Sequence, residues 1–173
     1  YYSLLVMALG FFSCEEHPKV VEQKKPRIFP EYSEALDEII RSKDGVIRGV
    51  DLNSKADVIT KTETKQPSEV AHDYLYFEYT IDSITNYSVA YNLQKDSLDE
   101  VEVQINCNDL DLSSHLFNDL KTYYEKKLPN PTEDKGFVVY NCFEGQRKPF
   151  VVSLTDNSTP NMGIINLVIY KDK

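Results

Sequence analysis

Histidine, cysteine and glycine are scarce in this chain of 173 residues, and their scarcity argues against several kinds of catalytic site. The three histidines, His17, His72 and His115, include no pair at metal-ligand spacing and form no cluster with cysteine. No serine stands in a GxSxG elbow, and the six glycines form no phosphate-binding loop. The sequence therefore predicts no metal, no cofactor and no enzymatic activity.

Basic residues are in the minority, with 19 against 28 acids and a formal net charge of -9. A field of that sign repels phosphate backbones and anionic lipid surfaces, so nucleic acid is not expected as a partner. Hydrophobic residues make up 41% of the chain, which is enough for a core. The length suits one domain.

Two groups of acidic and amide residues resemble sites, and each has an ordinary explanation. Residues 106–111 lack the glycine and the bidentate glutamate of a calcium loop. We interpret their acids as favouring the positive N-terminus of the helix that follows. Glu100 and Glu102 are two apart on the water-facing side of a predicted strand, so we expect nearly normal pKa values and no acid–base pair.

The apolar run near the N-terminus is too short to span a membrane. Leu4 to Phe12 carry no charge, but a spanning helix needs about 20 apolar residues. The run has the length of the apolar part of a secretory signal, and Phe11-Phe12-Ser13-Cys14 resembles a bacterial lipobox. The resemblance implies a signal peptide at 1–13, without its basic start, and a lipid anchor on Cys14. The alternative is a buried first helix or strand that ends in a core cysteine.

The residues after Cys14 are similar to those of lipoproteins from Gram-negative bacteria. Glu15 and Glu16 resemble the acidic tag that sends some of these to the outer face of the outer membrane, although adjacent acids are common in so acidic a chain. Residues 14–30 mix charges with prolines, which predicts a flexible tether. We therefore expect a lipid-anchored protein at the outer membrane, on its periplasmic or its cell-surface face.

Periodic patterns divide residues 31–173 into helices and strands. Helical spacing predicts a helix within 31–45 and another within 112–128. A short helix from Asn53 or Ser54 to about Glu63 should bury Val58 and Ile59. Alternation of period two predicts six strands, at residues 73–82, 86–93, 98–107, 137–143, 149–155 and 162–170.

The order of a helix followed by three strands thus occurs twice, in halves of about 31–107 and 108–173. It predicts a single α+β domain with helices packed on one face of an antiparallel sheet, built from two helix-plus-three-strand repeats. Cys107 closes the third predicted strand and Cys142 lies in the fourth. They form either a disulfide or two buried thiols, and the sequence leaves both open.

The first predicted strand points Leu75 and Phe77 to the core and Tyr74, Tyr76 and Glu78 to the opposite face. Exposed aromatic residues on a sheet are candidate contact residues, so we predict partner binding by these three. The alternative is that the tether or the first helix covers the tyrosines.

One family resemblance covers about a third of the chain. The stretch "RGVDLNSKADVITKTETKQP", with "DYLYFEY" and "KDSLDEVEV", resembles the repeat of SmpA/OmlA-type outer-membrane lipoproteins and of the β-lactamase-inhibitor-like fold. Its positions are occupied here by Gly49, Ser54, Val58, Tyr74, Tyr76, Leu98 and Val101. The resemblance implies a non-enzymatic domain that binds other proteins through its sheet face or its loops.

Two functions stay open. The first is a membrane-tethered scaffold that binds another envelope protein, and the second is a lipoprotein that binds a glycan or a nutrient beside a transporter. A flat face with tyrosines would favour the first, and a cleft lined by aromatics from both sheet halves would favour the second. The turn tripeptides 82–84 and 96–98 resemble a bacterial O-glycosylation signal, without settling whether they are modified.

Overall fold

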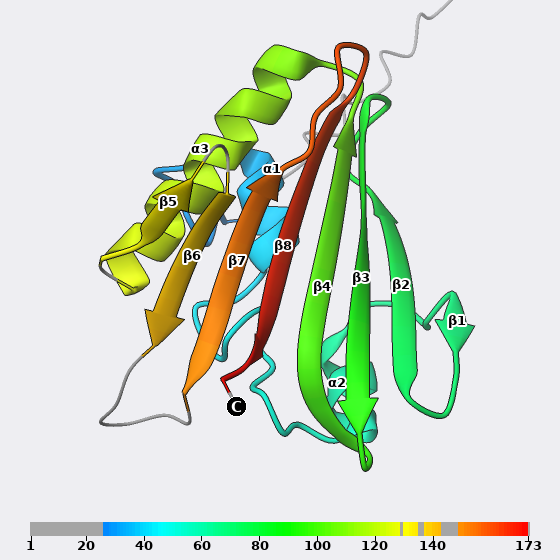
Figure 1. The fold of residues 1–173 in the computed structure, drawn as a ribbon. Coiled ribbons are helices and arrows are strands. Elements are labelled where there is room, and N and C mark those ends of the chain that lie inside the picture. Colours follow the sequence, from blue (N-terminus) through cyan, green and yellow to red (C-terminus); the bar gives the residue numbers. More distant parts are fainter. Residues whose placement is uncertain (1–25, 129, 135–136, 143–148, 173) are drawn as a thin grey trace, which may run out of the picture.

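The structure is a computed structural model in which residues 26–128, 130–134, 137–142 and 149–172 are described. The predicted signal peptide, the lipidation site Cys14 and the tag Glu15–Glu16 lie outside the described residues. Within them the helices are α1 (Glu34–Ile40), α2 (Ala56–Thr62) and α3 (Leu110–Lys127) (Figure 1). The strands are β1 (Glu69–Val70), β2 (Tyr74–Thr80), β3 (Thr85–Gln94), β4 (Ser97–Cys107), β5 (Thr132–Asp134), β6 (Phe137–Cys142), β7 (Phe150–Asp156) and β8 (Gly163–Lys171).

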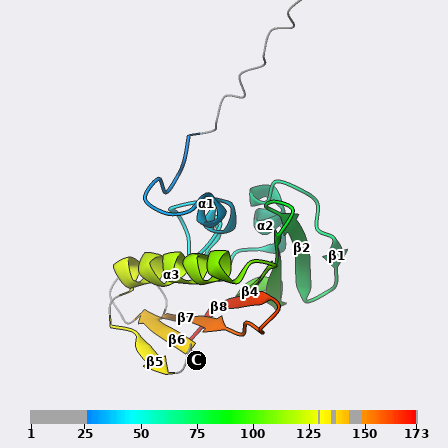
Figure 2. The same ribbon diagram turned by 90° about the horizontal axis from the view of Figure 1, so that it is seen from above.

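The eight strands form one antiparallel sheet in the order β1-β2-β3-β4-β8-β7-β6-β5. β2, β3 and β4 follow one another as a meander, and so do β5 to β8. The two meanders join where β4 pairs with β8, from Glu100 opposite Tyr170 to Cys107 opposite Gly163. α3 connects β4 to β5, and all three helices lie on the same side of the sheet (Figure 2).

The prediction of an α+β domain made of two helix-plus-three-strand repeats is wrong. Strands hold 43% and helices 23% of the described residues, so the fold is β-rich, and one sheet runs through both halves. The halves also differ, because α1 and α2 have 7 residues each and α3 has 18. Alternation in a sequence marks a strand but does not name its neighbour, so it could not reveal the pairing of β4 with β8.

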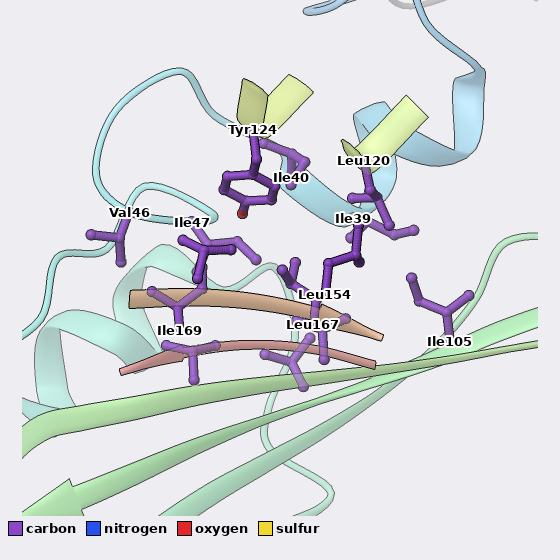
Figure 3. Packing of buried hydrophobic residues seen from close by; sticks show 14 of the residues in the cluster. Ile39, Ile40, Val46, Ile47, Ile105, Leu120, Tyr124, Leu154, Leu167 and Ile169 are labelled. Atoms are coloured by element: carbon purple, nitrogen blue, oxygen red, sulfur yellow. The ribbon is translucent and has the colours of Figure 1, made fainter. Parts of the chain in front are cut away.

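The core lies between the helices and the inward face of the sheet (Figure 3). Phe77, Val89 and Val103 are in register across β2, β3 and β4, and all three are buried, which confirms the predicted inward face of these strands. The residues that Figure 3 labels come from α1, the loop after it, α3 and the sheet: Ile39, Ile40, Val46, Ile47, Ile105, Leu120, Tyr124, Leu154, Leu167 and Ile169.

The helices follow their local sequence signals with two corrections. α3 is capped by Asp109, whose side chain accepts a hydrogen bond from the Leu112 backbone N at 2.9 Å, so an acid of the 106–111 group does serve a helix N-terminus. α2 begins after Lys55, later than predicted. Its Ile59 is fully buried, but Val58 is 42% exposed, so the prediction that Val58 is buried is wrong.

Residues 26–30 belong to the folded domain, so the predicted tether was drawn too long. Phe29 is buried and packs edge-on against Tyr123 of α3, with ring centroids 5.3 Å apart. Arg27 Nε donates to Asp37 Oδ2 of α1 at 2.8 Å. The described chain therefore joins the domain on the helical side of the sheet (Figure 2).

The disulfide alternative for Cys107 and Cys142 is wrong, since both thiols are free. β8 and β7 lie between their strands, which places β4 and β6 about 14 Å apart at the usual strand spacing. Cys107 pairs with Gly163 at one end of β8, whereas Cys142 aligns through Phe150 with Lys171 at the other end. The two Cα atoms are thus far beyond the reach of a disulfide, about 7 Å.

Candidate partner-binding site

The face of β2, β3 and β4 that points away from the helices carries polar and aromatic side chains in register. Successive side chains of a strand point to opposite faces, so this face carries the residues between the core positions. Pairing aligns them in three rows across the strands: Tyr76–Ala90–Glu102, Glu78–Ser88–Gln104 and Thr80–Asn86–Asn106.

A hollow of about 630 Å³ lies over these rows, and we call it the open-face groove. The middle strand explains its shape, because Ala90 and Ser88 of β3 are short and the longer side chains of β2 and β4 rise on either side. The groove is lined by Lys65, Tyr76, Glu78, Tyr79, Thr80, Asn86, Tyr87, Ser88, Ala90, Glu102, Gln104 and Asn106.

The three residues predicted to bind a partner all lie on this face. Tyr76 and Glu78 line the groove, and Tyr74 lies one row beyond them, opposite Asn92. A hydrogen bond with Glu69 of β1, followed by desolvation, raises the pKa of Tyr74. The first helix does not cover the tyrosines, because α1 packs on the opposite face of the sheet (Figure 2).

Two carboxylates share one amide at the end of the groove near Tyr74. Asn92 Nδ2 lies 2.9 Å from Glu100 Oε1 and 2.7 Å from Glu102 Oε1. Burial raises the pKa of Glu100, and the neighbouring Glu102 and Asp99 add to this, while the hydrogen bond from Asn92 opposes it. The expectation of a nearly normal pKa is therefore wrong for Glu100.

The carboxylates of the groove have no positive partner among the residues that the structure describes. The described ion pairs use other acids, such as Asp57 with Lys61 and Glu133 with Lys121. Lys65 lies at the rim, but it bonds the backbone carbonyl of Glu78 and stands 4.8 Å from the centre of the Tyr79 ring. The groove is thus an acidic, hydrogen-bonding surface with one tyrosine, Tyr76, among its side chains.

No family model, curated protein or solved structure matches this chain. The resemblance to SmpA/OmlA-type lipoproteins stays a prediction.

The described ranges contain neither a metal centre nor a membrane-spanning helix. No group of three or more histidine, cysteine, aspartate or glutamate side chains there could hold a metal ion. His72 and His115 are both exposed. None of the helices within these ranges is long and apolar enough to cross a membrane.

A buried ionic network on the helical side supports the strands of the groove. Glu63, at the end of α2, accepts from Arg48 Nε and Nη2, both at 2.8 Å, and from Arg41 Nη1 at 2.7 Å. The hydroxyls of Tyr79, at 2.6 Å, and Tyr91 donate to the same carboxylate. The network therefore links the loop after α1, the end of α2, β2 and β3.

Glu63 and Arg48 compensate each other's charge, so we interpret this network as a structural element. Burial alone would raise the pKa of Glu63, but the hydrogen bonds and charge of Arg48, with Tyr79 and Tyr91, lower it overall. Burial would lower the pKa of Arg48, and its bonds to Glu63 raise it instead. The Arg48 guanidinium also lies over the Tyr79 ring, 4.7 Å from its centre.

Sequence reasoning missed this network. One signal was present, since Arg48 interrupts the apolar run "VIRGV", where a lone charge indicates a buried arginine that needs a carboxylate. Glu63 gave no comparable signal, because it stands in the polar stretch "TKTETKQ".

Proposed function

We propose that this chain is a non-catalytic binding module of the bacterial outer envelope, tethered through a lipid on Cys14, and that its open-face groove binds another envelope protein. The observation that carries the proposal is the groove itself: a hollow that contains Tyr76 and Glu78, that no described segment covers, and that lies on a sheet whose other face is core.

The construction of the groove suits recognition of a protein. Its residues stand on three paired strands held from behind by packed side chains, so they lose little freedom on binding. Tyrosine is enriched among residues that dominate binding energy, because it combines a large apolar ring with a polar end. The lining is also polar, whereas small-molecule pockets are mostly apolar.

The position of the chain start supports a tethered arrangement. The described chain begins on the helical side of the sheet (Figure 2). The groove opens on the opposite side. The 12 residues from Cys14 to Lys25 can span at most about 40 Å when extended. A lipid on Cys14 would therefore be joined to the domain on the side of the sheet opposite the groove.

Affinity capture from the native envelope tests the proposal. The lipidated protein should capture one defined envelope protein when the complex is fixed by chemical crosslinking. The Tyr74→Ala/Tyr76→Ala variant should fail to capture that protein. The control is Phe137→Ala, because Phe137 is 43% exposed and aligns with Thr155 of β7, far from β2. Capture that survives in the double variant, or that the control abolishes equally, contradicts the proposal.

A second candidate function is binding of a glycan or another polar nutrient beside a transporter. It is favoured by the amides and hydroxyls of Asn86, Ser88, Gln104 and Asn106, which with the Tyr76 ring could bind a polyhydroxylated ligand. Against it, the groove lies over β2 to β4 alone and is not lined by both halves of the sheet. Calorimetric titration with an oligosaccharide panel that shows saturable heat, lost in Tyr76→Ala, would favour this candidate.

A further inference from the structure

The dimensions of the open-face groove select an extended chain. β2 and β4 form its walls and β3 its floor, so the walls stand about 10 Å apart at the usual strand spacing. Along the strands the groove runs from Tyr76 to Thr80, about 13 Å at the usual rise per residue. That space holds the backbone of about four extended residues lying along the strands, with every second side chain directed at the floor and walls.

The charges of the groove select positive side chains. Glu78 of β2 and Glu102 of β4 stand on opposite walls, and Glu100 lies one row beyond Glu102. The described residues place no cation within ion-pair distance of any of the three. Asn92 holds Glu100 and Glu102 side by side, so their repulsion is built into the free protein. A bound ammonium or guanidinium group would relieve it.

We propose that the open-face groove takes an extended peptide segment of a partner protein whose lysine or arginine side chains lie between Glu78 and Glu102. This inference rests on the proposed function and names the chemistry of its partner. A dimer in which two such faces pack against each other does not fit, because it would bring the same carboxylates together. Lys65 does not compete for the site, since it is engaged with the Glu78 carbonyl and the Tyr79 ring.

Three labelled peptides test the inference by fluorescence anisotropy. Each has eight residues and alternates threonine with arginine, glutamine or glutamate, and each is titrated with the full-length protein in nonionic detergent. The arginine peptide should bind at least tenfold more tightly than the glutamine peptide, and the glutamate peptide should bind more weakly still. Raising the salt from 50 to 300 mM should reduce this preference, because exposed charges are screened.

Two double variants test whether binding depends on the carboxylates of the groove or only on the net charge of the protein. Glu78→Gln/Glu102→Gln should weaken binding of the arginine peptide at least fivefold, while the amide oxygen introduced at position 102 can still accept the hydrogen bond from Asn92. Asp44→Asn/Asp51→Asn removes the same charge from exposed positions outside the groove and should change binding less than twofold. Equal binding of the arginine and glutamine peptides, or equal losses in the two variants, overturns the inference.

The outcome is distinguishable from failure of the proposed function. One outcome is that an envelope protein is captured through Tyr74 and Tyr76 while the arginine peptide binds no more tightly than the glutamine peptide. In that case the proposed function stands, and the inference that the bound segment is basic is wrong. If the arginine peptide binds in the groove but the native protein captures no envelope protein, the proposed function fails while the charge preference of the groove holds.

Discussion

At the scale of the residue, the hydroxyl of Tyr124 is the clearest defect of the core. The ring is 1% exposed, and its hydroxyl has no hydrogen-bond partner among the described residues. Burial raises its pKa well above the ordinary value. Tyr140 is as deeply buried, but its hydroxyl donates to the Lys121 carbonyl at 3.0 Å. The two tyrosines thus form a natural matched pair.

We predict that Tyr124→Phe stabilises the protein by about 1 kcal/mol, because it removes a hydroxyl that folding desolvates without supplying a hydrogen-bond partner from the described residues. Tyr140→Phe should destabilise it by about 1 kcal/mol, because a satisfied hydrogen bond is lost. Urea unfolding followed by circular dichroism measures both. A Tyr124→Phe variant that unfolds at lower urea than the parent would show that this hydroxyl is satisfied in the folded protein.

The network around Glu63 predicts how stability depends on pH. The folded state holds the pKa of Glu63 below its ordinary value of 4.5. The stabilisation from Glu63 is therefore present above pH 4.5 and is lost as the pH falls toward the lowered value. Free energies of unfolding measured between about pH 3 and pH 7 should show this loss in the parent protein.

The Glu63→Gln variant should have a free energy of unfolding that depends less on pH in the acidic range below pH 4.5. At neutral pH it should also cost about 3–5 kcal/mol, because it leaves the Arg48 charge buried without its partner. If it does not fold, Tyr79→Phe tests the same network more gently, since it removes one hydrogen bond that lowers the pKa of Glu63. Its acid loss should then be smaller and be complete at a higher pH than in the parent, and an unchanged profile would contradict the role given to Glu63.

At the scale of the element, the contact between α3 and β8 requires a residue without a side chain. A Cβ atom on Gly163, at the start of β8, would lie 2.2 Å from Ser113 Oγ and 2.3 Å from Ser113 Cβ. Ser113 is buried in the first turns of α3. The N-terminal part of α3 is therefore seated directly on the sheet, next to the end of β4.

We predict that Gly163→Ala destabilises the protein by about 1–3 kcal/mol, because α3 and β8 must move apart. Ser113→Gly alone should cost about 1 kcal/mol, as glycine does inside a helix. The double variant should lose less stability than the two single variants together, because removing the Ser113 side chain also removes the clash with the new Cβ at position 163. Strict additivity in thermal unfolding would contradict the close seating of α3.

Most individual elements could be predicted from the sequence, and their assembly could not. Alternation in β2, β3 and β4 was clear because one face is core and the other is polar, and the apolar stripe of α3 was equally clear. β1 and β5 were missed because two and three residues are too short for a period to show. The central pairing of β4 with β8 depends on contacts between residues about 60 apart, which no local pattern contains.

The sequence predicted which residues of the candidate site share a face, because this depends on a local pattern, but it did not predict the groove, which depends on how the strands pair. Alternation placed Tyr74, Tyr76 and Glu78 on the face opposite the core, and the structure confirms that placement. The hollow itself depends on Ala90 and Ser88 lying between the side chains of two neighbouring strands, so it required the register. The raised pKa of Glu100 was missed because it depends on burial and on the carboxylate held beside it.

At the scale of the whole molecule, the sheet divides the protein into two sides of different character. The start of the described chain lies on the helical side of the sheet (Figure 2), together with the core and the ionic network. The opposite side contains the open-face groove. In a protein anchored through Cys14, this arrangement presents the groove to partners and keeps the chain start on the other side. We therefore propose that partners bind on the open face of β2 to β4.

Site-specific photocrosslinking in the native envelope tests this claim most directly. Replacing Tyr76 by p-benzoylphenylalanine places the reactive ring in the groove, and the same replacement of Phe137 places it on another exposed part of the sheet. We predict that position 76 crosslinks to one defined envelope protein and that position 137 does not. Crosslinking from neither position, or to the same proteins from both, would contradict the account.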